Sequence, residues 1–377
     1  MQIPFNKPFL GVEEKQNINE VFNNGKFSGD GVFTKIASKK LEKLTGAKKV
    51  LLTHSGTAAL EMAALLIDLK EGDEVILPSY TFVTSASSFV LRGATPVYVD
   101  IELRDLNIDT STIEKAITKK TKAIIVVHYA GKAVNMDAVM KIANSYDLIV
   151  IEDAAQAINS SYKGSQLGTI GHFGTYSFHE TKNLISGEGG AILINDEKYI
   201  ARAEMIREKG TNRSQFLRGE IDKYTWRELG SSYLPSELNA AVLSAQIDKI
   251  HFITDQRRAV CKKYETKLRS LIGNGLISIS SQSDYGKTNG HIFYTLLDGS
   301  VDRELILKDL KDRGINAVSH YEPLHLSPYG KKIGRASGGL ENTCFAASNI
   351  VRLPVWVGME DSEIAYVCET LKELILR

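Results

Sequence analysis

The sequence predicts an α/β protein whose larger part is a mostly parallel sheet covered by helices on both faces. From residue 49 to about 195, short and nearly continuous apolar runs alternate with amphipathic stretches. This is the pattern of buried parallel strands joined by helices. After Gly273-Asn274-Gly275 the strands become shorter, which indicates a smaller α+β domain. Because 377 residues exceed what one core usually serves, we expect two domains, at residues 1–250 and 251–377.

The individual elements follow from the same periodicity. Strands of the larger domain are expected at 50–52, 74–77, 96–99, 123–127, 148–151, 174–178 and 191–194. Helices are expected at about 57–68, 82–92 and 136–146, with a long helical stretch from about 236 to 271. In the smaller domain, strands are expected at 277–279, 291–294 and 351–353, and helices at about 302–313 and 360–376.

Composition narrows the range of partners and compartments. The net charge is +1, so no basic excess points to nucleic acid or to an anionic membrane. Cys261, Cys344 and Cys368 are widely spaced and form neither a CxxC pair nor a disulfide framework, as is typical of a reducing compartment. The N-terminus does not read as a signal peptide, and no apolar run approaches the ~20 residues that span a bilayer. We therefore expect a cytoplasmic protein without a metal site.

Polar residues follow several of the predicted strands. Ser55, Ser79, His128 and Asp153 all fall where such a strand ends. In sheets of this class, ligands bind beyond the carboxyl ends of the strands. The sequence therefore predicts a functional site at this edge, before any motif is considered.

Lys182 is the most informative residue of the chain. It follows a predicted strand in the segment Ser177–Asn183 and precedes the glycine-rich stretch at 187–190. A free lysine, with a pKa of about 10.4, is a poor nucleophile at neutral pH, and a Schiff base with an aldehyde cofactor would activate it. Most lysines are solvated surface residues, but this context favours a functional one.

Asp153 supplies the second requirement of such a cofactor. A buried carboxylate at the end of a strand needs a partner, and a protonated ring nitrogen would be one. A helix N-cap is an equally acceptable interpretation of Asp153. An amine and a carboxylate in this arrangement predict pyridoxal 5'-phosphate as the cofactor.

Other residues fit the remaining parts of that cofactor. Ser55-Gly56-Thr57 opens a predicted helix, whose free amides could bind phosphate, although a simple N-cap is the commoner role. Gln156 could bind the ring oxygen or form a capping box with Asp153. Phe82 could stack on the ring or belong to the core. Neither a GxGxxG nor a P-loop motif is present.

Taken together, these motifs resemble the DegT/DnrJ/StrS-type sugar-nucleotide aminotransferases. These enzymes have the aspartate aminotransferase fold, fold type I of the pyridoxal phosphate enzymes. The likeness spans nearly the whole chain. It is carried by the segment around Lys182 and by Pro4–Pro8, Gly29–Gly31, Ser55–Leu60, Pro78–Phe82, Glu152–Gln156 and Tyr321–His325.

The resemblance implies roles for the matching residues. Lys182 would carry the cofactor as an internal aldimine, Asp153 would bind the pyridine nitrogen and Gln156 the ring oxygen. Phe82 would stack on the ring. The phosphate would be held by Gly56, Thr57 and Ser177.

The resemblance also implies a homodimer whose site is completed by the neighbouring subunit. Ser232 stands where the family usually has the asparagine of an Asn-Tyr-Arg-type turn, so this cross-subunit phosphate contact departs from the common form. Tyr321 and His325 would contact the substrate. Arg213 could meet a diphosphate, because arginine suits bidentate phosphate binding, or could belong to a solvated charged loop.

Within the family, the segments 178–183, 208–216 and 223–226 resemble the members that form dTDP-4-amino-4,6-dideoxygalactose. That likeness implies that L-glutamate donates its amino group to dTDP-4-keto-6-deoxyglucose and leaves as 2-oxoglutarate. The cofactor would alternate with pyridoxamine 5'-phosphate. The product would serve surface polysaccharides such as lipopolysaccharide O-antigen or enterobacterial common antigen.

Several alternatives stay open at this stage. The product amine could be equatorial, giving dTDP-4-amino-4,6-dideoxyglucose, or the acceptor could be a 3-keto sugar. Relatives that dehydrate sugars carry histidine at the lysine position, and Lys182 argues against that reaction. A non-enzymatic regulator of the same fold is disfavoured by the complete set of Lys182, Asp153, Gln156 and Ser177.

Overall fold

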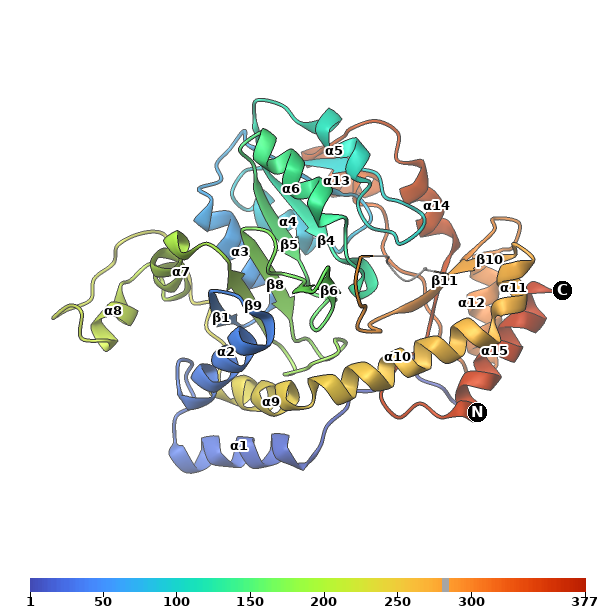
Figure 1. The fold of residues 1–377 in the computed structure, drawn as a ribbon, viewed down its shortest axis with the longest axis horizontal. Helices are drawn as coiled ribbons and strands as arrows, with labels where there is room; N and C mark the ends of the chain where they lie inside the picture. The colour runs from blue at the N-terminus through green and yellow to red at the C-terminus, as the bar shows by residue number, and fades with distance from the viewer. Residues whose placement is uncertain (280–284) are drawn as a thin grey trace.

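The computed structural model describes residues 1–279 and 285–377, and its centre is an eight-stranded sheet (Figure 1). The strand order is β1-β9-β8-β5-β4-β2-β3-β12, and β9 alone runs antiparallel to its neighbours. The strands are β1 (Lys49–Thr53), β2 (Glu74–Pro78), β3 (Thr95–Val99), β4 (Thr121–Val127), β5 (Ile149–Asp153), β8 (Phe173–Ser177), β9 (Gly190–Ile194) and β12 (Arg335–Ala336). The prediction of a mostly parallel sheet is confirmed.

Helices cover both faces of this sheet because side chains of successive strand residues point to opposite sides. Val50 and Leu52 pack into one core, whereas Leu51 between them packs into the other. The first face is covered by α2 (Val32–Thr45), α5 (Thr110–Ala116), α6 (Met136–Ser145) and α9 (Glu237–Asp248). The second face is covered by α3 (Gly56–Leu66), α4 (Thr84–Val90) and α7 (Ile200–Arg207). Helix α1 (Val12–Asn24) packs outside α9.

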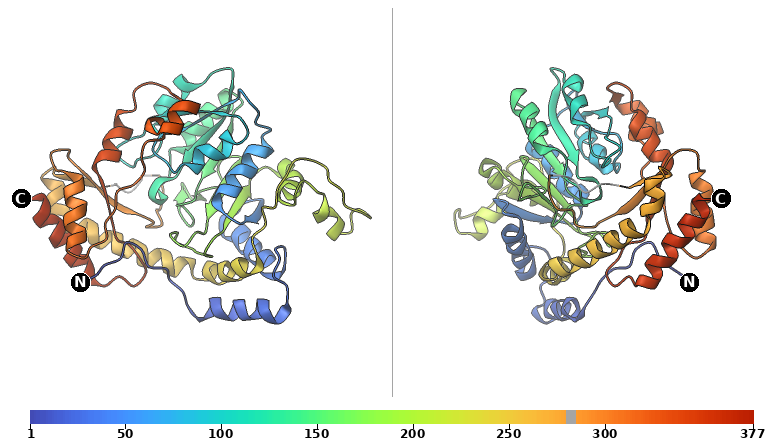
Figure 2. Two further views of the ribbon diagram at one scale, coloured as in Figure 1. Left: turned by 180° about the vertical axis from the view of Figure 1, so that it is seen from behind. Right: turned by 45° about the vertical axis from the view of Figure 1, so that its right-hand side comes forward.

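The smaller unit has its own antiparallel sheet, β10-β11-β13, and its own core. Its elements are α11 (Arg269–Gly273), β10 (Ile277–Ile279), β11 (Phe293–Leu297), α12 (Arg303–Asp312), β13 (Ile350–Leu353) and α15 (Asp361–Ile375). Helix α10 (Ile250–Lys267) joins the two units, since Ile253 packs in the large core and Tyr264 in the small one. Figure 2 shows α10 running from α9 toward α15.

The long helical stretch and the domain ranges differ from the sequence-based expectation. The helical stretch expected at 236–271 is three helices, because the chain turns at Lys249 and at Leu268. The two units also do not follow the expected ranges 1–250 and 251–377, because residues from each range pack with the other unit. Ile3 packs into the small core and pairs with Ile315, while Leu324, Leu340 and β12 join the large unit.

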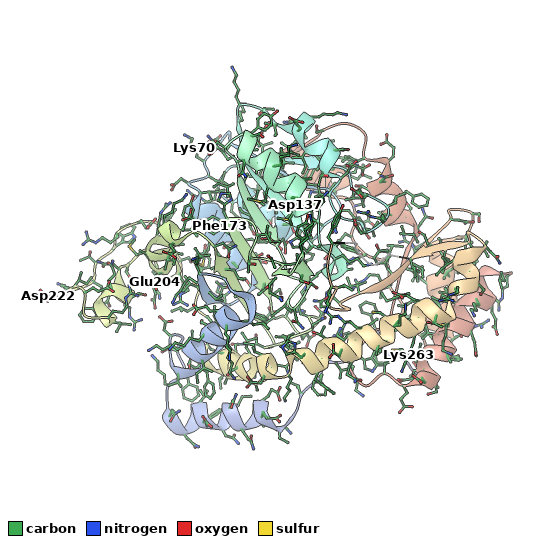
Figure 3. All side chains as sticks on the ribbon, in the orientation of Figure 1. Lys70, Asp137, Phe173, Glu204, Asp222 and Lys263 are labelled. Carbon is green, nitrogen blue, oxygen red and sulfur yellow. The ribbon has the colours of Figure 1, made fainter. Side chains whose placement is uncertain are left out.

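Several short elements have no counterpart in the predicted pattern. They are β6 (Ser161–Tyr162), β7 (Ser165–Gln166), β12, α8 (Arg213–Leu217), α13 (Pro328–Ile333) and α14 (Glu341–Asn349). The helices α1, α2, α5 and α7 were not predicted either. The segment that holds α8 projects from the body in both figures, and Figure 3 places Asp222 near its tip. Within the described residues, no helix combines the length and apolar character needed to cross a bilayer.

Candidate active site

A cavity of about 440 Å³ lies at the carboxyl edge of the large sheet and is closed on the other side by the small unit. Ser55 follows β1, Asp153 ends β5 and Ser177 ends β8, so three strands deliver side chains to it. His291 and Arg352 reach it from the small unit. The cavity therefore lies at the edge of the sheet where the sequence predicted a site, beyond the carboxyl ends of the strands.

Asp153 is buried at the base of this cavity, with 6% of its surface exposed. Its Oδ2 accepts a hydrogen bond from Ser85 Oγ at 2.7 Å, and its Oδ1 accepts one from the amide of Ala155 at 3.2 Å. No helix begins at this point, so Asp153 is not a helix cap. Within the described residues the carboxylate forms no ion pair, and a cation in the cavity would offset the cost of burying it.

Lys182 lies in the loop after β8 and lines the same cavity. Burial lowers its pKa to about 8; Asp153 opposes this shift, and Arg352 adds to it. At pH 7 about one in ten of these amines is therefore neutral, far more than for an ordinary lysine. A neutral amine is the form that attacks a carbonyl or accepts a proton.

Gln156 is held in one orientation by its neighbours. Its Oε1 accepts a hydrogen bond from the amide of Ala130 at 2.7 Å, and its Nε2 donates to Tyr321 Oη at 2.9 Å. A backbone amide can only donate, so the side-chain oxygen must face Ala130. One Nε2 proton remains for a further acceptor. These partners replace the capping box that the sequence also allowed.

The aromatic side of the cavity is formed by Phe82 and Tyr321. Their ring centroids are 6.1 Å apart at an angle of 45°. Phe82 is 52% exposed, so it belongs to the wall of the cavity and not to the core. A planar ring could stack there.

The first turn of α3 forms the polar end of the cavity. Ser55 caps this helix by accepting a hydrogen bond from the amide of Ala58 at 3.0 Å. Gly56 and Thr57 follow, and a Cβ on Gly56 would lie 3.0 Å from the Cβ of Ser177. Amides of a first helical turn have no partners within the helix and attract anions. With the hydroxyls of Thr57 and Ser177, this end suits a phosphate.

Three predicted site residues lie outside the cavity of the single chain. Ser232 is exposed and forms a β-bridge with Glu208. Arg213 does not line the cavity, and its partly exposed guanidinium pairs with the buried Glu208 at 2.9 Å. His325 Nδ1 is 2.7 Å from Ser79 Oγ, and neither residue lines the cavity.

His128, the fourth strand-end residue, is also absent from the cavity wall. Its Nε2 lies 2.8 Å from a carboxylate oxygen of Glu152, and both side chains are fully buried. Glu152 also accepts hydrogen bonds from the amides of Gly168, Ile170 and Gly171. The pair therefore supports the strand that carries Asp153.

The residues contributed by the small unit were not predicted from the sequence. Arg257, His291 and Arg352 line the cavity together with Phe5 and Asn6 from the N-terminus. Arg352 is the clearest case, because an arginine inside the apolar strand Val351–Leu353 is itself a signal. Its guanidinium lies 4.7 Å from the centroid of the Phe5 ring, and its buried Nε has no hydrogen-bond partner among the described residues.

Comparisons with known proteins bear on this arrangement. Residues 8–372 match the model of the DegT/DnrJ/EryC1/StrS aminotransferase family. The chain is 33% identical to MJ1066 of Methanocaldococcus jannaschii, over 99% of this chain and 97% of that protein. It is 30% identical to the spore coat polysaccharide biosynthesis protein SpsC of Bacillus subtilis, with the same coverage.

Solved structures agree with these sequence matches. Spr1654 of Streptococcus pneumoniae in its PLP form superposes with a TM-score of 0.91 at 26% identity, covering 100% of this chain and 99% of that one. The amine of Lys182, the buried carboxylate of Asp153 and the polar end at α3 suit that cofactor. The chain therefore belongs to the DegT/DnrJ/EryC1/StrS aminotransferase family, and it is a pyridoxal phosphate-dependent sugar aminotransferase.

Proposed function

We propose that this enzyme transfers the amino group of L-glutamate to C4 of dTDP-4-keto-6-deoxy-D-glucose, giving dTDP-4-amino-4,6-dideoxy-D-galactose for a surface polysaccharide. The observation that carries the amino transfer is Lys182, with its lowered pKa, in one cavity with an unpaired carboxylate. The choice of sugar rests on the likeness of the segments 178–183, 208–216 and 223–226. The similarity to SpsC supports a role in polysaccharide synthesis.

In this proposal the cofactor supplies an electrophilic carbon and a ring that accepts electrons. Asp153 would hold the protonated ring nitrogen, and the remaining Nε2 proton of Gln156 would bind the ring oxygen. Gly56, Thr57 and Ser177 would hold the phosphate at the polar end. Lys182 Nζ removes the proton from Cα of glutamate and later delivers a proton to C4 of the sugar.

Arg352 supports an anionic amino donor. It forms no ion pair within the described residues, and its guanidinium lies over the Phe5 ring and lines the cavity. Arginine binds carboxylates through two parallel hydrogen bonds. A carboxylate of glutamate would bind the guanidinium of Arg352, and the amino nitrogen of glutamate would then face Lys182.

A homodimer is also part of the proposal. The projecting segment around α8 exposes large apolar side chains, with Trp226 77%, Leu217 58% and Leu229 54% exposed. Exposed apolar groups gathered on one projection favour contact with another protein surface. In a dimer, Ser232 at the root of this segment would approach the phosphate end of the neighbouring cavity.

The deciding experiment is turnover of dTDP-4-keto-6-deoxyglucose with glutamate, followed by NMR coupling constants at C4 of the product. We expect an axial amine. An equatorial amine would assign the gluco product instead. Turnover with a 3-keto sugar, and none with the 4-keto sugar, would show that C3 and not C4 accepts the amino group. Borohydride reduction and peptide mapping should find the cofactor on Lys182, and an adduct elsewhere would overturn its role.

A further inference from the structure

The orientation of the Gln156 side chain depends on one backbone amide. Gln156 lines the cavity; its Oε1 accepts a hydrogen bond from the amide of Ala130 at 2.7 Å, and its Nε2 donates to Tyr321 Oη at 2.9 Å. A hydroxyl both donates and accepts, so Tyr321 would tolerate either end of the side-chain amide. The backbone amide of Ala130 can only donate, so it requires Oε1 as its partner. This contact therefore decides that Nε2, and not Oε1, has a group left for a ligand.

Ala130 has an unusual backbone conformation for a residue with a side chain. Its φ of 55° and ψ of 20° lie in the left-handed region, and Gly131 follows with a φ of 76°. The amide of Lys132 donates to the carbonyl oxygen of Tyr129 at 2.9 Å, as in a type I′ turn. A left-handed alanine is less stable than a right-handed one, and such strain persists only where the surroundings impose it. The direction of the Ala130 N–H depends on this turn.

Asn107 holds both ends of the turn at residues 129–132. Its Oδ1 accepts a hydrogen bond from the amide of Tyr129 at 2.9 Å, and its Nδ2 donates to the carbonyl oxygen of Lys132 at 3.3 Å. An amide N–H only donates and a carbonyl only accepts, so the two ends of the Asn107 side chain cannot be exchanged. Asn107 is 2% exposed, and its own amide donates to Asp105 Oδ1 at 3.0 Å. The side chain that holds the turn is therefore buried and itself fixed in place.

The surroundings leave the turn little room to change. A Cβ on Gly131 would collide with Asn289 Oδ1 and would lie 3.0 Å from the carbonyl oxygen of Gln156. Asn289 Nδ2 donates to that same carbonyl oxygen at 2.9 Å. Thr288 Oγ1 donates to the carbonyl oxygen of Ala130 at 3.4 Å, and Ala130 is fully buried. The turn and Gln156 are thus packed together as one unit.

We propose that Asn107 is a positioning residue: by holding the turn at residues 129–132, it fixes the Gln156 side chain with Nε2 toward the ring oxygen of the cofactor. The inference rests on the role proposed above for Gln156. If the side-chain amide rotated, Oε1 would face that ring oxygen, and two acceptors would repel each other. The left-handed conformation of Ala130 aims its amide at Oε1 and prevents this rotation.

The test compares two ligands that differ only at the ring oxygen. Pyridoxamine 5'-phosphate has it, and 3-deoxypyridoxamine 5'-phosphate lacks it. Neither has an aldehyde to react with Lys182, so calorimetry of the cofactor-free protein measures noncovalent binding alone. A hydrogen bond to the ring oxygen should make the wild-type protein bind the first ligand about tenfold more tightly. The ratio of the two dissociation constants reports this bond, because a general loss of stability weakens both ligands alike.

Two substitutions of Asn107 should lower this ratio. Asn107→Ala removes both contacts with the turn, so the ratio should fall from about ten to about two as the Gln156 amide becomes free to rotate. Asn107→Asp has nearly the same shape and provides the test if Asn107→Ala does not fold. It sets a second oxygen against the carbonyl oxygen of Lys132, so the ratio should fall here as well.

Asn135→Ala is the matched control. Asn135 caps α6 by accepting a hydrogen bond from the amide of Ala138 at 3.3 Å, and it also accepts one from Tyr162 Oη at 3.2 Å. It makes no hydrogen bond to the turn within the described parts of the chain. The control should lower the free energy of unfolding, as the Asn107 variants do, and keep the ratio at about ten.

The outcomes that contradict the proposal are distinct from those that contradict the proposed function. An unchanged ratio in the folded Asn107 variants, or an equal fall in Asn135→Ala, overturns the positioning role. A wild-type ratio of about one would show that Gln156 does not bind the ring oxygen, which defeats that proposed contact and this inference with it. Borohydride mapping that places the cofactor on another lysine would instead defeat the role of Lys182.

Discussion

Lys182 and Asp153 are coupled through the cavity that they share. The carboxylate opposes the lowering of the lysine pKa, and it would also compensate a cationic ring nitrogen. We expect Asp153→Asn to lower turnover with glutamate by at least about 100-fold and to shift the pKa of Lys182 further below 8. Single-turnover absorbance and acylation of Lys182 would measure the two effects. Wild-type turnover in this variant would refute the assignment.

Burial of Lys182 also has a cost in stability. The folded chain binds a proton at this amine with a pKa of about 8, whereas the unfolded chain does so near 10.4. Between these values the unfolded state binds more protons, so stability rises with pH; below pH 8 the full cost remains. Lys182→Met should therefore stabilise the cofactor-free protein by about 3 kcal/mol at pH 7.

The same variant should gain less than about 1 kcal/mol at pH 10, where the unfolded amine also loses its proton. Denaturant unfolding at the two pH values would measure the difference. Lys141→Met, on the exposed side of α6, is the control and should change little at either pH. A gain that does not depend on pH would mean that packing, not charge, explains the effect.

Arg352 gives a test of the amino donor. Losing a charged hydrogen-bond partner costs about 1.5–3 kcal/mol, so Arg352→Gln should raise KM for glutamate by about 10- to 100-fold. KM for the keto sugar should change little. Arg313→Gln, which removes an exposed ion pair with Glu373, is the matched control. Equal changes in both KM values would argue against a carboxylate subsite at Arg352.

At the scale of the elements, the site is made where strands end and helices begin. Gly56 opens α3 so close to β8 that any side chain would press on Ser177. Gly56→Ala should therefore displace the first turn and weaken binding of pyridoxal phosphate by about tenfold, near 1.4 kcal/mol. Fluorescence titration with the cofactor would report it. Gly273→Ala, where the new methyl group meets nothing within 4 Å, should bind normally.

The elements predicted from the sequence are those with a strong local pattern. Most of β2 and β4 consists of unbroken apolar runs, residues 75–78 and 123–127, and α6 has a clear apolar face. The break at Lys249 was missed because neither glycine nor proline marks it; residues on both sides of the break, Ile247 and Ile250, still pack in the large core. The two-residue strand β12 likewise depends on its pairing with β3 and has no local signal.

At the scale of the whole molecule, the projecting segment is the feature that a single chain does not explain. Trp226→Gln should weaken the proposed dimer and shift the sedimentation coefficient toward that of the monomer at low protein concentration. Cofactor affinity should fall with it, because Ser232 would no longer reach the neighbouring site. Tyr329→Gln, an exposed aromatic on α13, is the control. An unchanged sedimentation profile would place the interface elsewhere.

The sequence by itself determined the parallel sheet, pyridoxal phosphate as the cofactor, and the edge of the sheet where the cavity with Lys182 and Asp153 lies. These features follow from local patterns, since a strand, its end and the polar residue after it are adjacent in the chain. It also located Gly56, Thr57, Phe82, Gln156, Ser177 and Tyr321, and the structure brings all of them to one cavity.

Only the tertiary structure decided what closes that cavity. His291, Arg257 and Arg352 lie about 70 to 200 residues from Lys182 or Asp153 in the chain, and no periodicity links them. Their positions depend on how the small unit packs through α10. Arg213 instead pairs with Glu208, and His325 contacts Ser79, so neither side chain reaches the cavity. The lowered pKa of Lys182 is likewise a consequence of burial, which exists only once both units enclose it.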